Sequence, residues 1–145
     1  MLHALTTSFT SGNFNVSGHL QAWQKNADTS FSGLGVGTCP KALIAHGVET
    51  TVIELDPAVI RLAIKYFGLP SNLTMVTVDA ISFVQRAGDM RDSRKYDYIV
   101  HDVFTGGAEP IPLFTMELLT GLRELLKPNG TIAIVCSEMA SKTTC

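Results

Sequence analysis

From residue 33 onward, short apolar runs alternate with longer stretches in which apolar residues recur at helical spacing. The runs are strand-sized and rich in Val, Ile and Thr, and they occupy residues 51–55, 73–78, 96–100 and 131–136. The stretches between them predict amphipathic helices, most clearly at residues 58–67 and 113–126. Strands that are apolar throughout and separated by helices indicate a parallel sheet with helices on both faces, an α/β fold.

Residues 1–32 lack this alternation, because they are rich in Ser, Thr, Gly and Asn and show neither helical nor strand periodicity. We therefore expect an irregular N-terminal segment at 1–32, one domain at 33–138 and a tail at 139–145. A buried parallel strand should precede the glycine-rich turn that starts at Gly33, yet the residues before it are polar. This pattern predicts a first strand that is weak or missing, and the alternative is a weak strand at residues 29–34.

The last predicted strand follows a Lys-Pro-Asn-Gly turn at residues 127–130 and leaves only a few residues after it. A complete domain of this architecture usually continues into an antiparallel hairpin, so we expect the C-terminal hairpin to be absent. Together with the weak first strand, this pattern favours an incomplete copy of the domain, from truncation or alternative splicing.

Composition excludes several function classes. The chain has 145 residues, of which 46% are hydrophobic and 17% charged, and its net charge of −2 fits one globular domain. It has neither a run of Lys and Arg nor a bilayer-length apolar stretch, so neither nucleic acid nor a membrane is an expected partner. Three widely spaced cysteines without a paired motif indicate a reducing, cytoplasmic setting and no metal site.

A turn with three glycines, Gly33, Gly35 and Gly37, is the first candidate site, because glycine lets the backbone approach a ligand closely. Glu54 ends the next predicted strand at about the spacing, roughly 20 residues, at which an acid binds a ribose diol in nucleotide-binding folds. The plainer alternative is that Glu54 is a solvated acid at the end of a strand. Pro40 stands where a third glycine of the dinucleotide motif would fall, which counts against a nicotinamide oxidoreductase.

Two further acids, Asp79 and Asp102, follow the next two predicted strands. Because parallel strands place their carboxyl ends at one edge of the sheet, Glu54, Asp79 and Asp102 should line one crevice. Asp79 is equally well interpreted as the N-cap of a helix that begins near Ala80, and both roles can hold at once. His101 adjoins Asp102, but successive residues of an extended chain point to opposite sides, so we expect His101 to be structural.

The segments GLGVGT, VIELDPAVI, VDAISFV and YDYIVHDVFTGGAEPIPLFT resemble the spermidine synthase family of the class I methyltransferase superfamily, over residues 33–135. The resemblance implies a Rossmann-like class I methyltransferase fold. It also implies S-adenosylmethionine, or its decarboxylated form, as the co-substrate. By the same resemblance, Gly33, Gly35 and Gly37 form the nucleoside loop, and Glu54 binds the ribose. Asp79 and Ala80 contact adenine, and Asp102 is the catalytic acid that accepts a proton from an amine.

Two departures from the family pattern weaken the polyamine assignment. Val36 and Thr105 stand where aminopropyltransferases carry aspartates that handle cationic amines. Three possibilities therefore remain: aminopropyl transfer to an amine, methyl transfer to a small molecule, and a catalytically inactive nucleoside-binding fragment. The expected partner is a small-molecule substrate, with an amine as one candidate, and the pattern leaves homodimer formation open.

Overall fold

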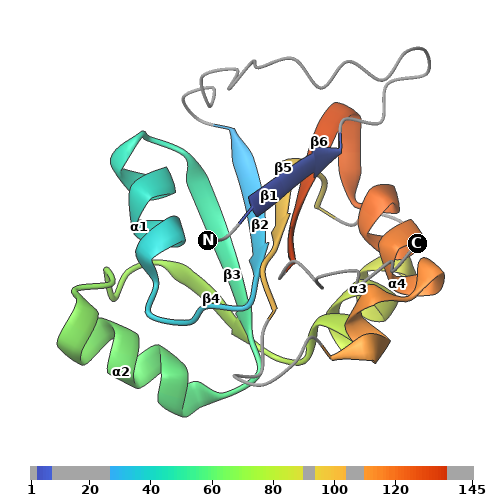
Figure 1. Ribbon diagram of the computed structural model, residues 1–145. Helices are drawn as coiled ribbons and strands as arrows, with labels where there is room; N and C mark the ends of the chain where they lie inside the picture. The colour runs from blue at the N-terminus through green and yellow to red at the C-terminus, as the bar shows by residue number, and fades with distance from the viewer. Residues whose placement is uncertain (1–2, 8–26, 90–93, 104–109, 137–145) are drawn as a thin grey trace, which may run out of the picture.

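The computed structural model describes residues 3–7, 27–89, 94–103 and 110–136, which form one sheet flanked by helices (Figure 1). The sheet order is β1-β6-β5-β2-β3-β4. The five strands from β2 to β6 pair in parallel, and β1 pairs with β6 antiparallel. The strands are β1 (His3–Thr7), β2 (Asp28–Ser32), β3 (Glu49–Glu54), β4 (Thr74–Thr77), β5 (Tyr96–His101) and β6 (Leu126–Cys136).

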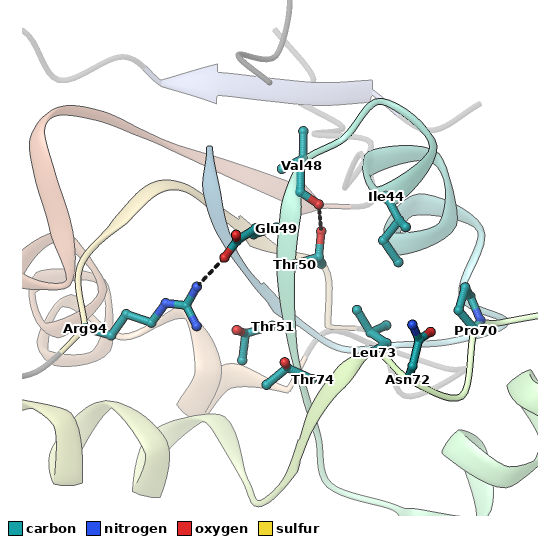
Figure 2. Close-up of a pocket in the computed structure, with 10 residues that line it drawn as sticks. All are labelled: Ile44, Val48, Glu49, Thr50, Thr51, Pro70, Asn72, Leu73, Thr74 and Arg94. Atoms are coloured by element: carbon teal, nitrogen blue, oxygen red, sulfur yellow. Dashed lines mark hydrogen bonds and ion pairs between the residues drawn. The ribbon is translucent and has the colours of Figure 1, made fainter. Parts of the chain in front are cut away.

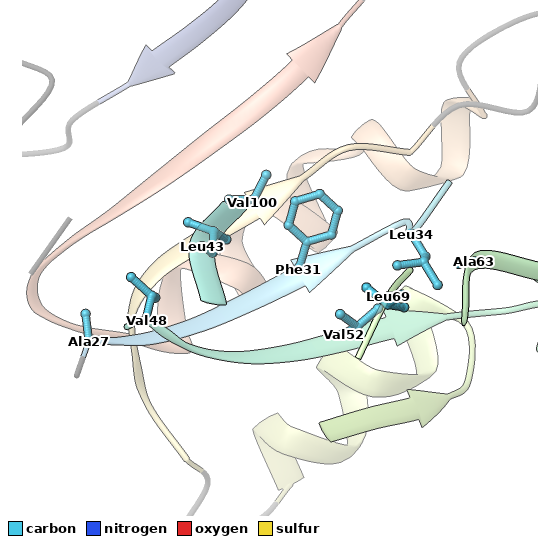
Figure 3. Packing of buried hydrophobic residues seen from close by; sticks show 9 residues of the cluster. All are labelled: Ala27, Phe31, Leu34, Leu43, Val48, Val52, Ala63, Leu69 and Val100. Carbon is cyan, nitrogen blue, oxygen red and sulfur yellow. The ribbon is translucent and has the colours of Figure 1, made fainter. Parts of the chain in front are cut away.

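Helices cover both faces of the sheet, which confirms the α/β expectation (Figure 1). They are α1 (Thr38–Ala45), α2 (Pro57–Phe67), α3 (Ala80–Asp89) and α4 (Met116–Glu124), with a 3₁₀ turn, η1 (Ile111–Phe114), before α4. One hydrophobic cluster joins α1 and α2 to the sheet through Leu43 and Ala63 (Figure 3). A second cluster packs α3 and α4 against Ile99 of β5. None of the helices in the described ranges is long and apolar enough to cross a membrane.

Local capping fixes where the helices begin. Asp56 accepts a hydrogen bond from Ala58 N at 2.7 Å, and Pro57 follows as the first residue of α2. Gly68 ends α2 with a left-handed φ of 64°. The helix predicted at 113–126 is shorter than its apolar pattern suggested, because Thr115 caps α4 by accepting from Leu118 N.

The first parallel strand, which we expected to be weak or missing, is present as the five-residue strand β2. β2 lies at the centre of the sheet, between β3 and β5, close to the weak strand considered at 29–34. Thr29, Ser30 and Ser32 are nearly or fully buried, and Phe31 provides the large apolar contact. Small hydroxyl side chains can occupy such a strand because its backbone groups are satisfied by two neighbouring strands. Because the prediction relied on apolar residues, it underestimated this strand.

Residues 3–7 supply the second correction, since the segment 1–32 is not irregular throughout. β1 runs antiparallel to β6, with His3 opposite Cys136 and Thr7 opposite Ile132. β1 is thus an antiparallel neighbour of β6, the last parallel strand. The antiparallel hairpin that we expected to be absent would instead follow β6 along the chain. Whether residues 137–145 add a hairpin lies outside the described residues.

The Lys-Pro-Asn-Gly segment does not separate α4 from the last strand as a turn. It lies within β6, where the pairing steps from Tyr96–Leu126 to Tyr98–Thr131. Residues 127–130 therefore bulge out opposite Asp97, and Asn129 takes a left-handed φ of 67°. The predicted turn before the last strand is therefore wrong, because these residues form a bulge between two paired parts of one strand.

Candidate functional site

The glycine turn lies against the carboxyl end of β5. Gly33 N donates to Ile53 O at 3.0 Å, and Gly37 N donates to Leu34 O at 2.9 Å. Gly33 has a φ of 86°, and a Cβ atom there would lie 2.1 Å from Asp102 O. Only glycine fits this position, because any side chain would collide with the backbone of Asp102.

Glu54 connects the glycine turn to the start of α2. Its Oε2 accepts from Leu34 N at 2.8 Å, and its Oε1 accepts from Asp56 N at 2.9 Å. The carboxylate is therefore engaged by two backbone groups and is not the freely solvated acid of the plainer alternative. Each carboxylate oxygen still has a second lone-pair direction, so the group can accept from two more donors, such as adjacent hydroxyls.

Asp79 caps α3, which confirms the capping interpretation. Its Oδ1 accepts from Ser82 N at 2.9 Å. The hydrogen bond with the Ser82 side chain and the backbone bonds at this helix start lower the pKa of the Asp79 carboxyl. Val78 N donates to Glu54 O at 3.1 Å, so the turn that carries Asp79 and buried Ala80 adjoins the end of β3.

Asp102 follows β5, and its backbone N donates to Ser32 O at 2.9 Å. Partial burial raises the pKa of its carboxyl above the usual value. The pKa of the Cys39 thiol, in the first turn of α1, is also raised, first by desolvation and then by the charge of Asp102.

His101 contacts η1. The side chain is fully buried, its Nε2 lies 2.8 Å from Leu113 O, and its ring meets Phe114 edge-on at 5.2 Å. Burial lowers the pKa of the imidazole, which favours the neutral ring. These contacts support the structural role expected for His101.

The predicted site residues thus meet at one edge of the sheet. Gly33 N bonds to β3, Asp102 N bonds to β2, and Val78 N bonds to Glu54, so the carboxyl ends of β2 to β5 are tied together. Val36 is 48% exposed at the tip of the glycine turn. Thr105, the second departure from the family pattern, lies outside the described residues. Among the described residues, no group of three His, Cys, Asp or Glu side chains could hold a metal ion.

Sequence reasoning missed a charged network at the opposite edge, where the strands begin. Lys127 Nζ lies 2.8 Å from Asp28 and 2.9 Å from Asp97, and Arg94 pairs with both Asp28 and Glu49. Asp28 N also donates to the Asp97 carboxylate at 2.8 Å. The charged residues that flank the strand starts are the sequence signal for this network.

A cavity of about 260 Å³ opens beside this network, at the amino ends of β3 and β4 (Figure 2). Its polar lining includes Thr50, Thr51, Thr74 and Asn72. Arg94, the cation that reaches it, is already paired with Glu49 and Asp28. Because the cavity lies at the amino ends of the strands, it is separated from Glu54 and Asp102, which lie at the carboxyl ends. Its two charged lining residues, Glu49 and Arg94, are paired with each other, so the cavity offers no unpaired charge.

The fold and these segments match known proteins. A profile of the spermine/spermidine synthase domain matches residues 34–144. A protein of Emericella nidulans named "N-terminal histidine N-methyltransferase" is 57% identical over 102 residues, which cover 70% of this chain and 18% of that protein. A "polyamine aminopropyltransferase" of Vibrio vulnificus is 38% identical over 104 residues, 69% of this chain and 34% of that protein. The chain thus spans 18% and 34% of the length of these two relatives.

Solved structures agree on the fold. Human methyltransferase-like protein 13, crystallised in complex with SAH, superposes with a TM-score of 0.67 at 21% identity, covering 74% of this chain and 53% of that one. Spermidine synthase from Thermotoga maritima superposes with a TM-score of 0.59 at 20% identity, covering 76% of this chain and 38% of that one. These likenesses confirm the Rossmann-like class I methyltransferase fold.

Proposed function

Because the chain belongs to the spermine/spermidine synthase domain family, we propose that it binds S-adenosylmethionine and transfers the methyl group to an amine. The observation that carries the proposal is the edge formed by the glycine turn, Glu54 and Asp102. The 57% identity to a protein named as an N-methyltransferase favours methyl transfer. Family membership counts against the nicotinamide oxidoreductase considered from the glycine turn alone.

The donor nucleoside would lie along the glycine turn. Glu54 is held by Leu34 N and Asp56 N, so its remaining lone pairs are oriented in advance toward the ribose hydroxyls. Ala80 and the capped turn at Asp79 offer a surface for adenine beside β4. The first turn of α1 presents backbone N–H groups toward the same side, where a carboxylate is favoured.

Val36 favours the intact donor over its decarboxylated form. An aspartate at this exposed position would repel the carboxylate of S-adenosylmethionine and attract the ammonium group that remains after decarboxylation. Valine does neither, which removes the electrostatic preference for the decarboxylated molecule. The family's aminopropyl chemistry needs that form, whereas methyl transfer uses the intact one.

By extension from the relative's name, the residue to be methylated is an N-terminal histidine, and we propose its α-amine, rather than an imidazole nitrogen, as the acceptor. An α-amine has a pKa of about 7.7–8.0, against about 10.4 for a lysine-type amine. A substantial fraction of the α-amine is therefore neutral and nucleophilic near pH 7, and a single acid suffices at the site. This agrees with the valine at position 36, where a polyamine site would carry a further aspartate.

In the reaction, the neutral amine nitrogen attacks the methyl carbon in line with the carbon–sulfur bond. A nitrogen–carbon bond forms, the carbon–sulfur electron pair returns to sulfur, and S-adenosylhomocysteine leaves. Asp102 orients the amine by accepting its N–H and can take the proton released from the methylated ammonium. The raised pKa of its partly buried carboxyl makes it a better base than an exposed aspartate. Positioning supplies most of the catalysis.

Aminopropyl transfer is the second candidate, because a protein named polyamine aminopropyltransferase is 38% identical to this chain. It predicts preference for the decarboxylated donor and for a diamine. Its weakness is the valine in the glycine turn, which leaves the aminopropyl ammonium without a counter-charge there.

One experiment separates the two candidates. The purified chain is titrated calorimetrically with S-adenosylmethionine, its decarboxylated form and S-adenosylhomocysteine, alongside the variant Val36→Asp. We expect the wild type to prefer the intact donor and Val36→Asp to shift that preference toward the decarboxylated form. Incubation with a histidine-initiated peptide should add the mass of one methyl group, and an N-acetylated peptide should stay unmodified. Preference of the wild type for the decarboxylated donor, with putrescine turnover, would overturn methyl transfer.

A further inference from the structure

His101 holds a position that packing alone does not explain. It is fully buried at the end of β5, where its backbone pairs with Ser32 of β2 and Ile134 of β6. Ile99, two residues earlier on the same side of the strand, is an ordinary core residue. A large apolar side chain would suit a fully buried position, so the imidazole requires another reason.

The hydrogen bond to Leu113 fixes the state of the ring. A backbone carbonyl only accepts, so the Nε2 atom 2.8 Å from Leu113 O must carry the hydrogen. In a neutral ring, Nδ1 is then an acceptor, and it is buried without a hydrogen-bond partner among the described residues. Leaving a buried acceptor unpaired costs free energy. The ring that leaves Nδ1 unpaired also forms the Nε2 bond to Leu113, which lies twelve positions away in the sequence.

That bond ties η1 to the residue that precedes Asp102. His101 lies immediately before Asp102, and Leu113 lies in η1, where the chain returns to the sheet before α4. The edge contact between His101 and Phe114 holds the same turn. The ring therefore holds η1 against the end of β5, beside the candidate site.

We propose that His101 is a positioning residue, which ties η1 to the end of β5 through its Nε2–H bond to Leu113 and thereby sets the place of the amine acceptor beside Asp102. The proposal rests on the proposed function, because it assigns the acceptor step to this edge. His101 touches neither donor nor acceptor. It acts through Asp102, whose backbone is held on the other side by Ser32 O and by the packed Gly33.

The consequence is a separation between the two substrates. The donor contacts of Glu54 and of the turn at Asp79 come from the ends of β3 and β4, and their hydrogen bonds run to Leu34, Asp56 and Ser82 and not to η1. Loss of the tether should therefore lower kcat/KM for the acceptor and leave donor affinity in place. A displacement of about 1 Å in a reacting group can cost about 100-fold in rate.

Three substitutions in the full chain test the tether. Glutamine carries its amide N–H at about the reach of Nε2, whereas asparagine carries it near the position of Nδ1, and phenylalanine keeps a ring without a donor. We expect His101→Gln to stay within about threefold of wild type in acceptor kcat/KM. His101→Asn and His101→Phe should lose about 10- to 100-fold. The affinity for S-adenosylhomocysteine should change by less than about twofold in all three.

Amide hydrogen exchange at residues 113–118 supplies a readout independent of turnover. Protection should persist in wild type and His101→Gln and fall in the other two variants. Equal protection in all four proteins, or full acceptor turnover by His101→Phe, would overturn the proposal. A parallel loss of donor affinity would do the same. If wild type binds no donor and methylates nothing, the proposed function fails and the positioning role falls with it, while the exchange data still decide whether the tether exists.

Discussion

The two edges of the parallel sheet use their acidic residues in opposite ways. At the amino edge, Asp28 and Asp97 are matched by Lys127 and Arg94, and the pKa of Asp28 is lowered, chiefly by its hydrogen bonds to these two cations. At the carboxyl edge, Glu54 and Asp79 bind backbone N–H groups, and no ion pair is recorded for them or for Asp102 in the described ranges.

This difference assigns stability to the amino edge of the sheet and ligand binding to the carboxyl edge. Ion pairs that join β2, β3, β5 and β6 hold the central polar strand in register, so the amino edge is electrostatically satisfied. The carboxyl edge keeps unneutralised acids with lone pairs to spare, and Asp102 remains ionisable in a partly buried place. Substitutions at the first edge should change the free energy of unfolding, and substitutions at the second should change ligand affinity.

Gly33→Ala should have the largest effect on stability, because Gly33, although it lies at the carboxyl edge, packs directly against the backbone of Asp102. The new Cβ would lie 2.1 Å from Asp102 O at a φ of 86°. We expect a loss of more than about 4 kcal/mol in the free energy of unfolding, or no folded protein. Gly35→Ala is the matched control. Its φ is 53° and no atom of the described residues lies within 4 Å of the added Cβ, so it should cost only about 1–2 kcal/mol. Equal thermal denaturation midpoints for the two variants would contradict the contact.

Glu54→Gln and Glu49→Gln compare the two ends of the same strand. Glu54 ends β3 at the carboxyl edge, and Glu49 begins it at the amino edge. Glu54→Gln should weaken binding of S-adenosylhomocysteine by about 1–3 kcal/mol, the value of hydrogen bonds to a charged group. Glu49→Gln should leave that affinity unchanged. Calorimetric titration of both variants decides the question, and a loss of affinity in both would mean that the edges are not separate.

Much of this fold could be predicted because its elements follow strong local signals. Asp56, Pro57 and Gly68 mark α2 at both ends, and the apolar runs locate β3, β4 and β5. β2 was underestimated because Thr and Ser look polar in a one-dimensional pattern, although two paired neighbours satisfy its backbone. β1 could not be predicted, since its pairing with β6 joins residues more than a hundred positions apart and no local periodicity records it.

The candidate site likewise combines features that the local sequence predicts with features that depend on distant contacts. The positions of the glycine turn, Glu54 and Asp102 followed from strand ends, which are local features. The backbone donors that hold Glu54 and the tether between His101 and Leu113 depend on how distant segments meet, so sequence alone could not supply them. The network around Asp28 and Lys127 spans 99 positions and was missed for the same reason.

Asp28→Asn should lower stability and spare binding. The carboxylate joins Lys127 and Arg94 and lies at the start of the central strand, so its loss leaves two cations without a shared partner. These pairs are partly exposed, which limits the expected cost to about 1–2 kcal/mol. Chemical denaturation measures it, and the affinity for S-adenosylhomocysteine should match the wild type. A variant that is as stable as wild type would show that the network contributes nothing.

The smallest effect is the most discriminating, because the two edges should respond to pH with opposite sign. The folded pKa of Asp28 is lowered below its unfolded value of 3.8, so its contribution to stability is present above that pH and is lost as the pH falls. The folded pKa of Asp102 is raised above 3.8, so the folded state binds more protons, and stability is lost as the pH rises through the folded pKa.

At pH 7, therefore, Asp102→Asn should raise the free energy of unfolding, by about 0.5 kcal/mol, since it removes a partly buried charge. Asp28→Asn should lower it at the same pH. The Asp102 difference should shrink as the pH falls through the raised folded pKa of Asp102 to 3.8 and below. The Asp28 difference should vanish only at a pH below the lowered folded pKa of Asp28, where its carboxyl is neutral in both states. Denaturation of the two variants and wild type across this range measures the signs. Destabilisation by Asp102→Asn at pH 7 would mean that an unrecognised partner neutralises this carboxylate, and the contrast between the two edges would not hold.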